Sequence, residues 1–589
     1  MTDPQTTKKK KGQLRRASAD PVKTQQQKGR EGGITLQGAF KYISALVLLA
    51  ALVLVHKHDP TILTNLLDSW IGFSEHWETF QPGPAIDNIG RLPADVPKRD
   101  AVVSAFKRDA MGDDEYHPIS QKGSNLSQAG GIGYTVIDSI DTMLLMSLDQ
   151  EHARARSWVA NKLSFERDGN FNTFETTIRV LGGLLSAYHL SSGDPIYLEK
   201  ATELANRILP VFESPSGLPH PMINLAAGTG VQNSDFTGLV STAEVSTLQL
   251  EFKYLSHLTG NDVYWKSVEN VMRIIKAARL PHGLASIFMS VEEGRYVTSA
   301  IRLGSRGDSF YEYLLFKLKP VKNGSEPVYS DMYDDAMAAI HNHLIQKSTK
   351  SKMTYTAELI PEEDASGEVS WRLTPKQDHL VCFLGGSLML GATRTGALIH
   401  PVSVPPRHKE LTASGQRDWK TGVELVKTCM DTHDTATGLS PEIVHFRIAS
   451  DGMDSNSMAP ADWYIKGARP GAFPPYDARY MLRPETVESL FLAYRLTGDQ
   501  LYRDHGWNIF QSIEKHCRVP TGGYATIVNV DEVPARHEDK METFLMSETL
   551  KYLYLLFDDS DTLPLDRYVF NTEAHPLPIF EPTIRTGFS

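Results

Sequence analysis

The chain has 589 residues, 41% hydrophobic and 22% charged, which is an ordinary globular composition. Its three cysteines, Cys382, Cys429 and Cys517, are too few for a disulfide scaffold and have the wrong spacing for a zinc site. The net charge is −11. Residues 1–41 carry ten Lys and Arg against three Asp and Glu, a balance of +7, so the rest of the chain carries −18. This acidic remainder argues against nucleic-acid binding, which requires a basic surface.

The N-terminal region is predicted to anchor the chain in a membrane. Residues 1–38 are basic and lack apolar periodicity, so we expect a disordered cytosolic tail. Residues 39–57 contain the apolar run AFKYISALVLLAALVLV, which predicts a signal-anchor transmembrane helix. A cleaved signal peptide is disfavoured, because the basic region is too long and VHKHDP has no small-x-small cleavage site. The basic flank predicts a single-pass type II protein with a lumenal body.

The body is predicted to be one large domain. Residues 58–99 are interpreted as a lumenal stem, and no Ser/Gly-rich linker interrupts residues 100–585. A helix–turn–helix pattern recurs, with a glycine that ends one helix and a tyrosine that begins the next: Gly193 with Tyr197, Gly260 with Tyr264, and Gly498 with Tyr502. The uneven spacing favours helical hairpins closed into an all-α toroid over a regular solenoid.

Several carboxylates lie where apolar helices are predicted to begin. Each has an ordinary explanation, because an Asp after a glycine often caps a helix and an i,i+4 pair such as Glu175 and Arg179 often forms a surface ion pair. Their joint occurrence indicates a functional cavity, since buried carboxylates are stable only when paired, metal-bound or used in catalysis. The residues are Glu175, Asp308, Glu442, Glu485, Glu488 and Glu548.

The segment YVFNTEAHPLP, Tyr568 to Pro578, places polar residues between a β-favouring run and two prolines. It indicates either a polar turn that caps a hairpin or a stiff support for Thr572, Glu573 and His575.

These segments together resemble glycoside hydrolase family 47. The match includes YTVIDSIDTM, FETTIRVLGGLLSAY, RGDSFYEYLL, GLSPEIV, LRPETVES, METFLMSETLKYLYLLF and VFNTEAHPLP, in order from Phe106 to Pro578. The resemblance implies an (α/α)7 barrel with a C-terminal β-hairpin plug. It also implies an enzyme that hydrolyses terminal α-1,2-linked mannose from high-mannose N-glycans with inversion.

The resemblance also implies residue roles. Glu175 is expected to be the acid and Glu485 the base, with Asp308 a competitor for the acid role and Glu442 the fourth carboxylate of the catalytic set. Which carboxyl carries the proton stays open. The substrate-binding residues it implies are Arg179, Arg306, His379, Leu380, Arg483 and Phe544.

A calcium ion is the cofactor that the resemblance implies. Thr572 would bind Ca²⁺ directly, and Glu488, Glu548 and Glu573 would hold it through water. The resemblance pairs Cys382 with Cys429 in a disulfide and leaves Cys517 free.

Arg306, two residues before Asp308, resembles the arginine of endoplasmic-reticulum members, which predicts one cut from nine mannoses to a single eight-mannose isomer. We therefore expect an endoplasmic-reticulum membrane location, with Golgi residence left open, and glycoproteins bearing high-mannose N-glycans as partners. A lectin-like, weakly active protein of the ER-associated degradation pathway is the alternative. A toroid acting on another glycan or on a terpenoid has no motif in its favour.

Overall fold

The computed structural model describes residues 92–582 except 107–113, 279–282, 317–325, 449–461 and 470, together with 584, 587 and 588. These residues all fall in one compact unit, Ile86–Ser589. None of the helices in this part of the chain is long and apolar enough to cross a membrane. The predicted tail, 1–38, and signal anchor, 39–57, lie outside the described residues and stay predictions.

The predicted helical hairpins are present. Helix α8 (Gly182–Leu190) is followed by α9 (Pro195–Ile208), α11 (Gln249–Thr259) by α12 (Asp262–Ala278), and α17 (Glu485–Thr497) by α18 (Gln500–His516). Gly260 and Gly498 end their helices in the left-handed conformation, each with φ of 71°, which glycine adopts without steric penalty. Asp499 then caps α18 by accepting the backbone N–H of Leu501.

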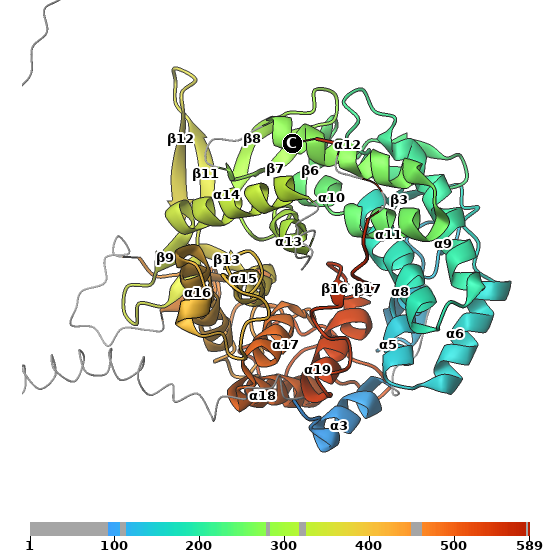
Figure 1. Ribbon diagram of the computed structural model, residues 1–589. Coiled ribbons are helices and arrows are strands. Elements are labelled where there is room, and N and C mark those ends of the chain that lie inside the picture. The colour runs from blue at the N-terminus through green and yellow to red at the C-terminus, as the bar shows by residue number, and fades with distance from the viewer. Residues whose placement is uncertain are drawn as a thin grey trace, which may run out of the picture. The chain divides into compact units, whose positions relative to one another are not determined.

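The helices form a ring around a central hairpin (Figure 1). This arrangement agrees with the expected (α/α)7 barrel. The remaining helices of the ring and its loops are α3 (Val96–Phe106), α4 (Tyr134–Asp138), α5 (Ile140–Leu145), α6 (Asp149–Asn161), α7 (Thr173–Glu175), α10 (Thr242–Ser246), α13 (Asp308–Phe316), α14 (Pro327–His343), α15 (Phe383–Ala392), α16 (Ala413–Asp431) and α19 (Leu550–Phe557). Helix α3 packs on α19 and overlaps the end of the predicted stem, 58–99.

The fold is mostly helical rather than all-α, because the loops at one end of the ring form antiparallel sheets. The largest has the strand order β12-β11-β8-β7-β6. Its strands are β6 (Leu239–Ser241), β7 (Ser286–Ser290), β8 (Tyr296–Ile301), β11 (Glu358–Glu363) and β12 (Val369–Thr374). The smaller sheets contain β1 (Glu115–His117), β2 (Lys122–Ser124), β3 (Asn170–Asn172), β4 (Met222–Asn224), β5 (Thr229–Val231), β9 (Ile345–Lys347), β10 (Thr354–Thr356), β13 (Lys376–Asp378), β14 (Ile443–Phe446) and β15 (Trp463–Tyr464).

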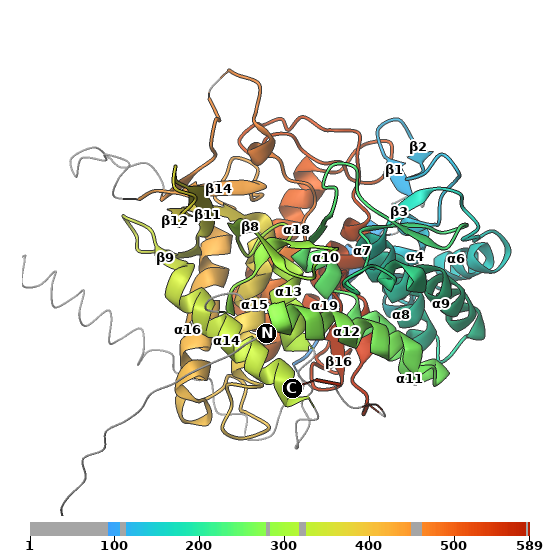
Figure 2. The same ribbon diagram turned by 90° about the horizontal axis from the view of Figure 1, so that it is seen from above.

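The hairpin of β16 (Tyr568–Phe570) and β17 (Pro576–Pro578) lies in the middle of the ring. Figure 2 shows β16 toward the opposite end of the barrel from β1, β3 and β14. The hairpin therefore enters the ring from one end, and its turn points toward the sheets at the other.

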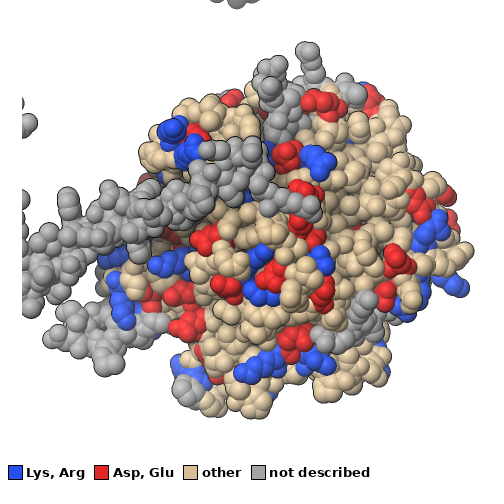
Figure 3. Space-filling view, turned by 60° about the horizontal axis from the view of Figure 1, so that its bottom comes forward, with Lys and Arg blue, Asp and Glu red and all other residues tan. Residues whose placement is uncertain are grey.

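Acidic and basic side chains lie interspersed on the face shown in Figure 3.

Candidate active site

A cavity of about 310 Å³ lies above the turn of the β16–β17 hairpin. Its walls come from the starts of helices α10, α13 and α17 and from two short π-helical turns, Thr176–Leu181 and Leu545–Thr549. Such turns are rare and often occur at functional sites. Among the predicted site residues, those that line the cavity are Glu175, Arg179, Arg306, Asp308, Leu380, Arg483, Glu485, Glu488, Phe544, Glu548, Thr572 and Glu573.

Asp308 and Glu485 are the first residues of α13 and α17, and both face the cavity. Burial raises the pKa of Asp308 to about 7, opposed by the backbone N–H of Ser309. Burial likewise raises the pKa of Glu485 to about 7, opposed mainly by the charge of Arg483. No described residue hydrogen-bonds Oε2 of Glu485. One carboxyl can therefore hold a proton near neutral pH while the other is ionised.

Glu175 is held by Arg179. Asn172 accepts the backbone N–H of Glu175 and so caps α7, which fixes the start of this segment. The Nε atom of Arg179 donates to Glu175 at 2.7 Å, and its Nη1 atom contacts Asp138 and Glu573. One guanidinium thus orients carboxylates from three separate segments, and the predicted contact of Arg179 with substrate stays a prediction.

Glu442 lies behind Arg483 rather than on the cavity wall. Arg483 donates through Nε at 2.8 Å and Nη2 at 2.6 Å to the two carboxylate oxygens of Glu442. The guanidinium carbons of Arg179 and Arg483 lie 5.8 and 5.6 Å from the ring centre of Phe544. Phe544 is therefore fixed between two cations at the edge of the cavity.

Thr572 occupies the turn of the hairpin, which is anchored on all sides. The side chain of Asn571 donates to Glu251 at 2.8 Å and accepts the backbone N–H of His575 at 2.8 Å. The ring of His575 bonds to Asp141 at 2.7 Å and to Asp138 at 3.1 Å. These bonds favour the protonated ring, and its pKa is raised although burial acts to lower it. The turn is a rigid support for Thr572, so the polar residues of NTEAHP do more than cap a hairpin.

Four buried glutamates surround Thr572: Glu312, Glu488, Glu548 and Glu573. Burial raises the pKa of Glu312 to about 8 and those of the other three well above their ordinary value. For Glu488, burial is joined only by repulsion from Glu312 and Glu485. This excess of buried carboxylates fits a cation. In the part of the chain that the structure describes, no three His, Cys, Asp or Glu side chains converge closely enough to hold an ion directly.

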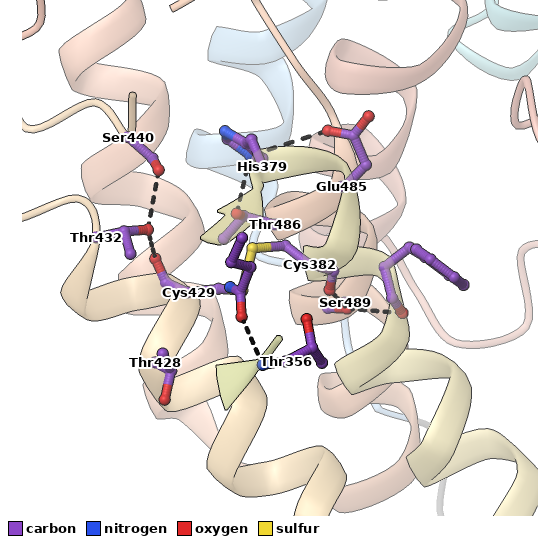
Figure 4. Close-up of a disulfide and its surroundings, with 12 residues drawn as sticks. Thr356, His379, Cys382, Thr428, Cys429, Thr432, Ser440, Glu485, Thr486 and Ser489 are labelled. Atoms are coloured by element: carbon purple, nitrogen blue, oxygen red, sulfur yellow. Dashed lines mark hydrogen bonds and ion pairs between the residues drawn. A yellow bond between two sulfur atoms is a disulfide. The ribbon is translucent and has the colours of Figure 1, made fainter. Parts of the chain in front are cut away.

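His379 is not among the residues that line the cavity, and its predicted contact with substrate stays a prediction. Its side chain is 1% exposed, and its Nε2 atom lies 3.0 Å from the Thr486 hydroxyl and 3.9 Å from Oε2 of Glu485 (Figure 4). Burial lowers its pKa well below the ordinary value, so the ring is neutral. His379 therefore supports the start of α17 from behind.

The disulfide that the resemblance implied is present between Cys382 and Cys429 (Figure 4). Cys429 belongs to α16, and Cys382 lies just before α15. Cys517 is a buried free cysteine, also as expected.

Glu312 and Glu244 are cavity residues that the sequence analysis missed. Glu312 lies four residues after Asp308 in RGDSFYEYLL, so both face one side of α13, and this i,i+4 spacing could have revealed it. Ser241 caps α10 and fixes the start of the segment that carries Glu244. Glu244 accepts a hydrogen bond from Arg306 across 62 residues of chain, which no local pattern predicts.

Comparisons with known proteins show which family the chain resembles. The family model described as Glycosyl hydrolase family 47 matches residues 102–579. The chain is 43% identical over 486 residues to a mannosyl-oligosaccharide 1,2-alpha-mannosidase of Candida albicans, covering 81% of each chain. It is 42% identical over 485 residues to the endoplasmic reticulum mannosyl-oligosaccharide 1,2-alpha-mannosidase of Homo sapiens, covering 81% of this chain and 62% of that one. An alpha-1,2-mannosidase from Trichoderma reesei has a similar structure, with a TM-score of 0.69 and 28% identity over 83% of this chain and 100% of that one.

Proposed function

Because the chain belongs to glycosyl hydrolase family 47, we propose that it hydrolyses terminal α-1,2-linked mannose from high-mannose N-glycans with inversion at the anomeric carbon. The observation that carries this proposal is the pair Asp308 and Glu485, two buried carboxyls with pKa values of about 7 on one cavity. Inversion requires one carboxyl that donates a proton to the leaving oxygen and a second that activates water on the opposite face of the sugar.

Glu485 is the proposed base. Its carboxyl group lines the cavity and can accept a proton from water, while Arg483 and the buried His379 hold its side chain and helix in place. Arg483 is itself fixed by Glu442, so the orientation of the base depends on residues from two segments.

The acid is Asp308 or Glu175. Asp308 is favoured as the residue that carries the proton, because burial raises its pKa to about 7. Glu175 is 36% exposed and bonded to Arg179. Glu175 would then hold a water or a sugar hydroxyl beside the leaving oxygen.

The cavity residues support calcium binding at Thr572. We infer that the threonine binds Ca²⁺ directly and that Glu488, Glu548 and Glu573, joined by Glu312, hold its water ligands. Bound Ca²⁺ would supply oxygen coordination that selects adjacent mannose hydroxyls. The buried glutamates would in turn be charged rather than protonated.

We also propose that the enzyme stops after one mannose, converting a nine-mannose glycan to one eight-mannose isomer in the endoplasmic reticulum. Arg306 lines the cavity two residues before Asp308 and presents a fixed fork of donors to a glycan branch. The endoplasmic reticulum location is supported by the name of the Homo sapiens relative. The signal anchor at 39–57 and the type II topology belong to the same proposal.

The test uses the purified full-length chain with a nine-mannose N-glycan. Mannose release is expected in calcium buffer and its loss in excess EDTA, with return on added Ca²⁺. Proton NMR of the first product should show β-mannose. Initial α-mannose would contradict inversion, and full activity in EDTA would contradict the dependence on Ca²⁺. Glycan binding without release of mannose would favour the lectin-like alternative.

A further inference from the structure

The guanidinium of Arg306 packs against two phenyl rings outside the residues already assigned to the reaction. Its Cζ atom lies 4.7 Å from the ring centre of Phe236 and 5.4 Å from that of Phe288. The two ring centres are 5.1 Å apart, with 34° between their planes. We call Phe236 and Phe288 the aromatic clamp.

The clamp lies beside the cavity because of sheet geometry. Phe288 is directly opposite Ser241 in the antiparallel pair of β7 and β6, so both side chains are on the same sheet face. Ser241 lines the cavity. Phe236 comes from the loop between β5 and β6. Neither phenylalanine lines the cavity itself, so they reach it through Arg306.

The backbone of Arg306 is also held in one direction. Its φ is +72°, a left-handed conformation that few residues other than glycine adopt. Its carbonyl accepts the backbone N–H of Ala243 at 3.0 Å, at the start of α10. The backbone conformation sets the direction in which the Arg306 side chain leaves the chain, and the clamp contacts its guanidinium.

The remaining contact of the guanidinium is with Glu244, whose carboxylate accepts from Nη1 at 3.3 Å. Within the described ranges, Glu244 is the one hydrogen-bond acceptor found for this side chain. Aromatic rings contact the guanidinium without using its N–H groups. The other N–H groups therefore stay available at its edge for hydroxyls of a bound sugar.

We propose that Phe236 and Phe288 are positioning residues that set the branch specificity of the enzyme by holding Arg306 in one orientation. The inference rests on the proposed function, in which Arg306 limits trimming to one mannose. Without the clamp, the long Arg306 side chain samples other rotamers. The enzyme still removes the first mannose, but further glycan branches can then enter the cavity and are trimmed as well.

The experiment follows a nine-mannose glycan with the full-length chain and its variants by chromatography over time. In Phe236→Ala, the first mannose should leave within about threefold of the wild-type rate, because the carboxyls are untouched. The share of products with seven or fewer mannoses, compared at equal conversion of the first step, should rise about fivefold. Phe288→Ala should give the same direction of change.

Two further variants of Phe236 test whether the clamp acts through its aromatic ring or only through its apolar volume. Phe236→Tyr retains the ring and should trim like the wild type, whereas Phe236→Leu retains the apolar character and should trim like Phe236→Ala. Phe236→Leu also serves if the alanine variant does not fold. The matched control is Trp371→Ala: Trp371 is 42% exposed on β12 of the same sheet and does not contact Arg306, so its loss should leave the product pattern unchanged.

Two results would overturn the inference in different ways. If the wild type stops at eight mannoses and the Phe236 and Phe288 variants stop there too, the clamp has no role in specificity and the proposed function stands. If the wild type itself runs on to five mannoses, or releases none, the proposed function fails and the inference fails with it.

Discussion

Aspartate and glutamate usually lie on protein surfaces, but Asp308 and Glu485 are buried, and this burial sets their pKa values. Each begins a helix that is rich in apolar residues, and packing of α13 and α17 removes the carboxyl from water. Desolvation disfavours the charged form of an acid, and that effect is the largest cause of the raised pKa of both residues. Sequence patterns indicate a functional cavity but not how far each carboxyl is removed from water.

The pH dependence of kcat distinguishes Asp308 from Glu175 as the acid. Activity should rise toward pH 7 as Glu485 loses its proton and fall above pH 7 as Asp308 loses its own, since both pKa values are about 7. Asp308→Asn should lower kcat about 10²–10⁴-fold and abolish the alkaline limb. Glu175→Gln should lower kcat but keep that limb. If Glu175→Gln lost the alkaline limb and Asp308→Asn kept it, Glu175 rather than Asp308 would be the acid.

Glu251 links pH to stability. It is fully buried in α11, accepts from Tyr313 and Asn571, and its pKa is raised to about 7, chiefly by burial. Because the folded pKa exceeds the unfolded value of about 4.5, its stabilising contribution is complete below pH 4.5 and is lost as pH rises to 7. The loss amounts to about 3 kcal/mol.

Glu251→Gln should therefore flatten the stability profile between pH 4.5 and 7, because the amide keeps the acceptor oxygen but cannot ionise. Denaturant unfolding at several pH values measures this change. The exposed Glu199→Gln is the control. An unchanged slope in Glu251→Gln would show that another group is responsible.

At the scale of elements, the β16–β17 hairpin is the part of the fold that brings chemistry to the centre of a ring of helices. Its turn is tied to α11 through Asn571, to α5 through His575 and Asp141, and to α19 through Lys551, which bonds Asp141 and the carbonyl of Ala574. Strand pairing alone, only three residues long, would not fix Thr572. The buried bonds to surrounding helices do.

Thr572→Ala tests this element as a metal support. The wild type in Ca²⁺ at about 100 times the Kd should be stabilised by about 3 kcal/mol relative to EDTA. In Thr572→Ala this difference should vanish while the EDTA-state Tm stays near that of the wild type, because alanine keeps the backbone N–H that Thr572 donates to Tyr313. Thr562→Ala, in the loop before the hairpin, should keep the full calcium effect. Equal calcium stabilisation of Thr572→Ala would place the ion elsewhere.

At the scale of the whole molecule, the ring is closed by contacts between distant parts of the chain. Helix α3, near the start of the described chain, packs on α19, near its end, and the side chain of Arg503 donates to the carbonyl of Pro93 at 2.9 Å. The disulfide adds a covalent link between the segment preceding α15 and helix α16, 47 residues apart. Helices α15 and α16 both pack against α17, which carries the proposed base.

Replacing Cys382 and Cys429 together by serine should lower the free energy of unfolding by about 4 kcal/mol, the value expected for a loop of this length. Activity of the molecules that remain folded should persist, since neither sulfur touches the cavity. Cys517→Ser should change stability much less. In the native wild type, a thiol reagent should leave Cys517 unmodified until the chain unfolds, because it is buried and burial raises its pKa. Rapid labelling of native Cys517 would contradict its position.

The sequence by itself determined the helical hairpins, the family and most of the cavity residues, because those depend on local signals. Glycines that end helices, capping residues and apolar periodicity act within a few residues, and the motifs of the family are contiguous. Tertiary structure alone decided that Glu442 stands behind Arg483, that His379 lies beside the start of α17, and that Phe236, Phe288 and Glu244 contact Arg306. It also decided the pKa values, because burial of a carboxyl depends on what packs over it. These contacts join residues tens to hundreds of positions apart, where no periodicity or spacing in the sequence carries the information.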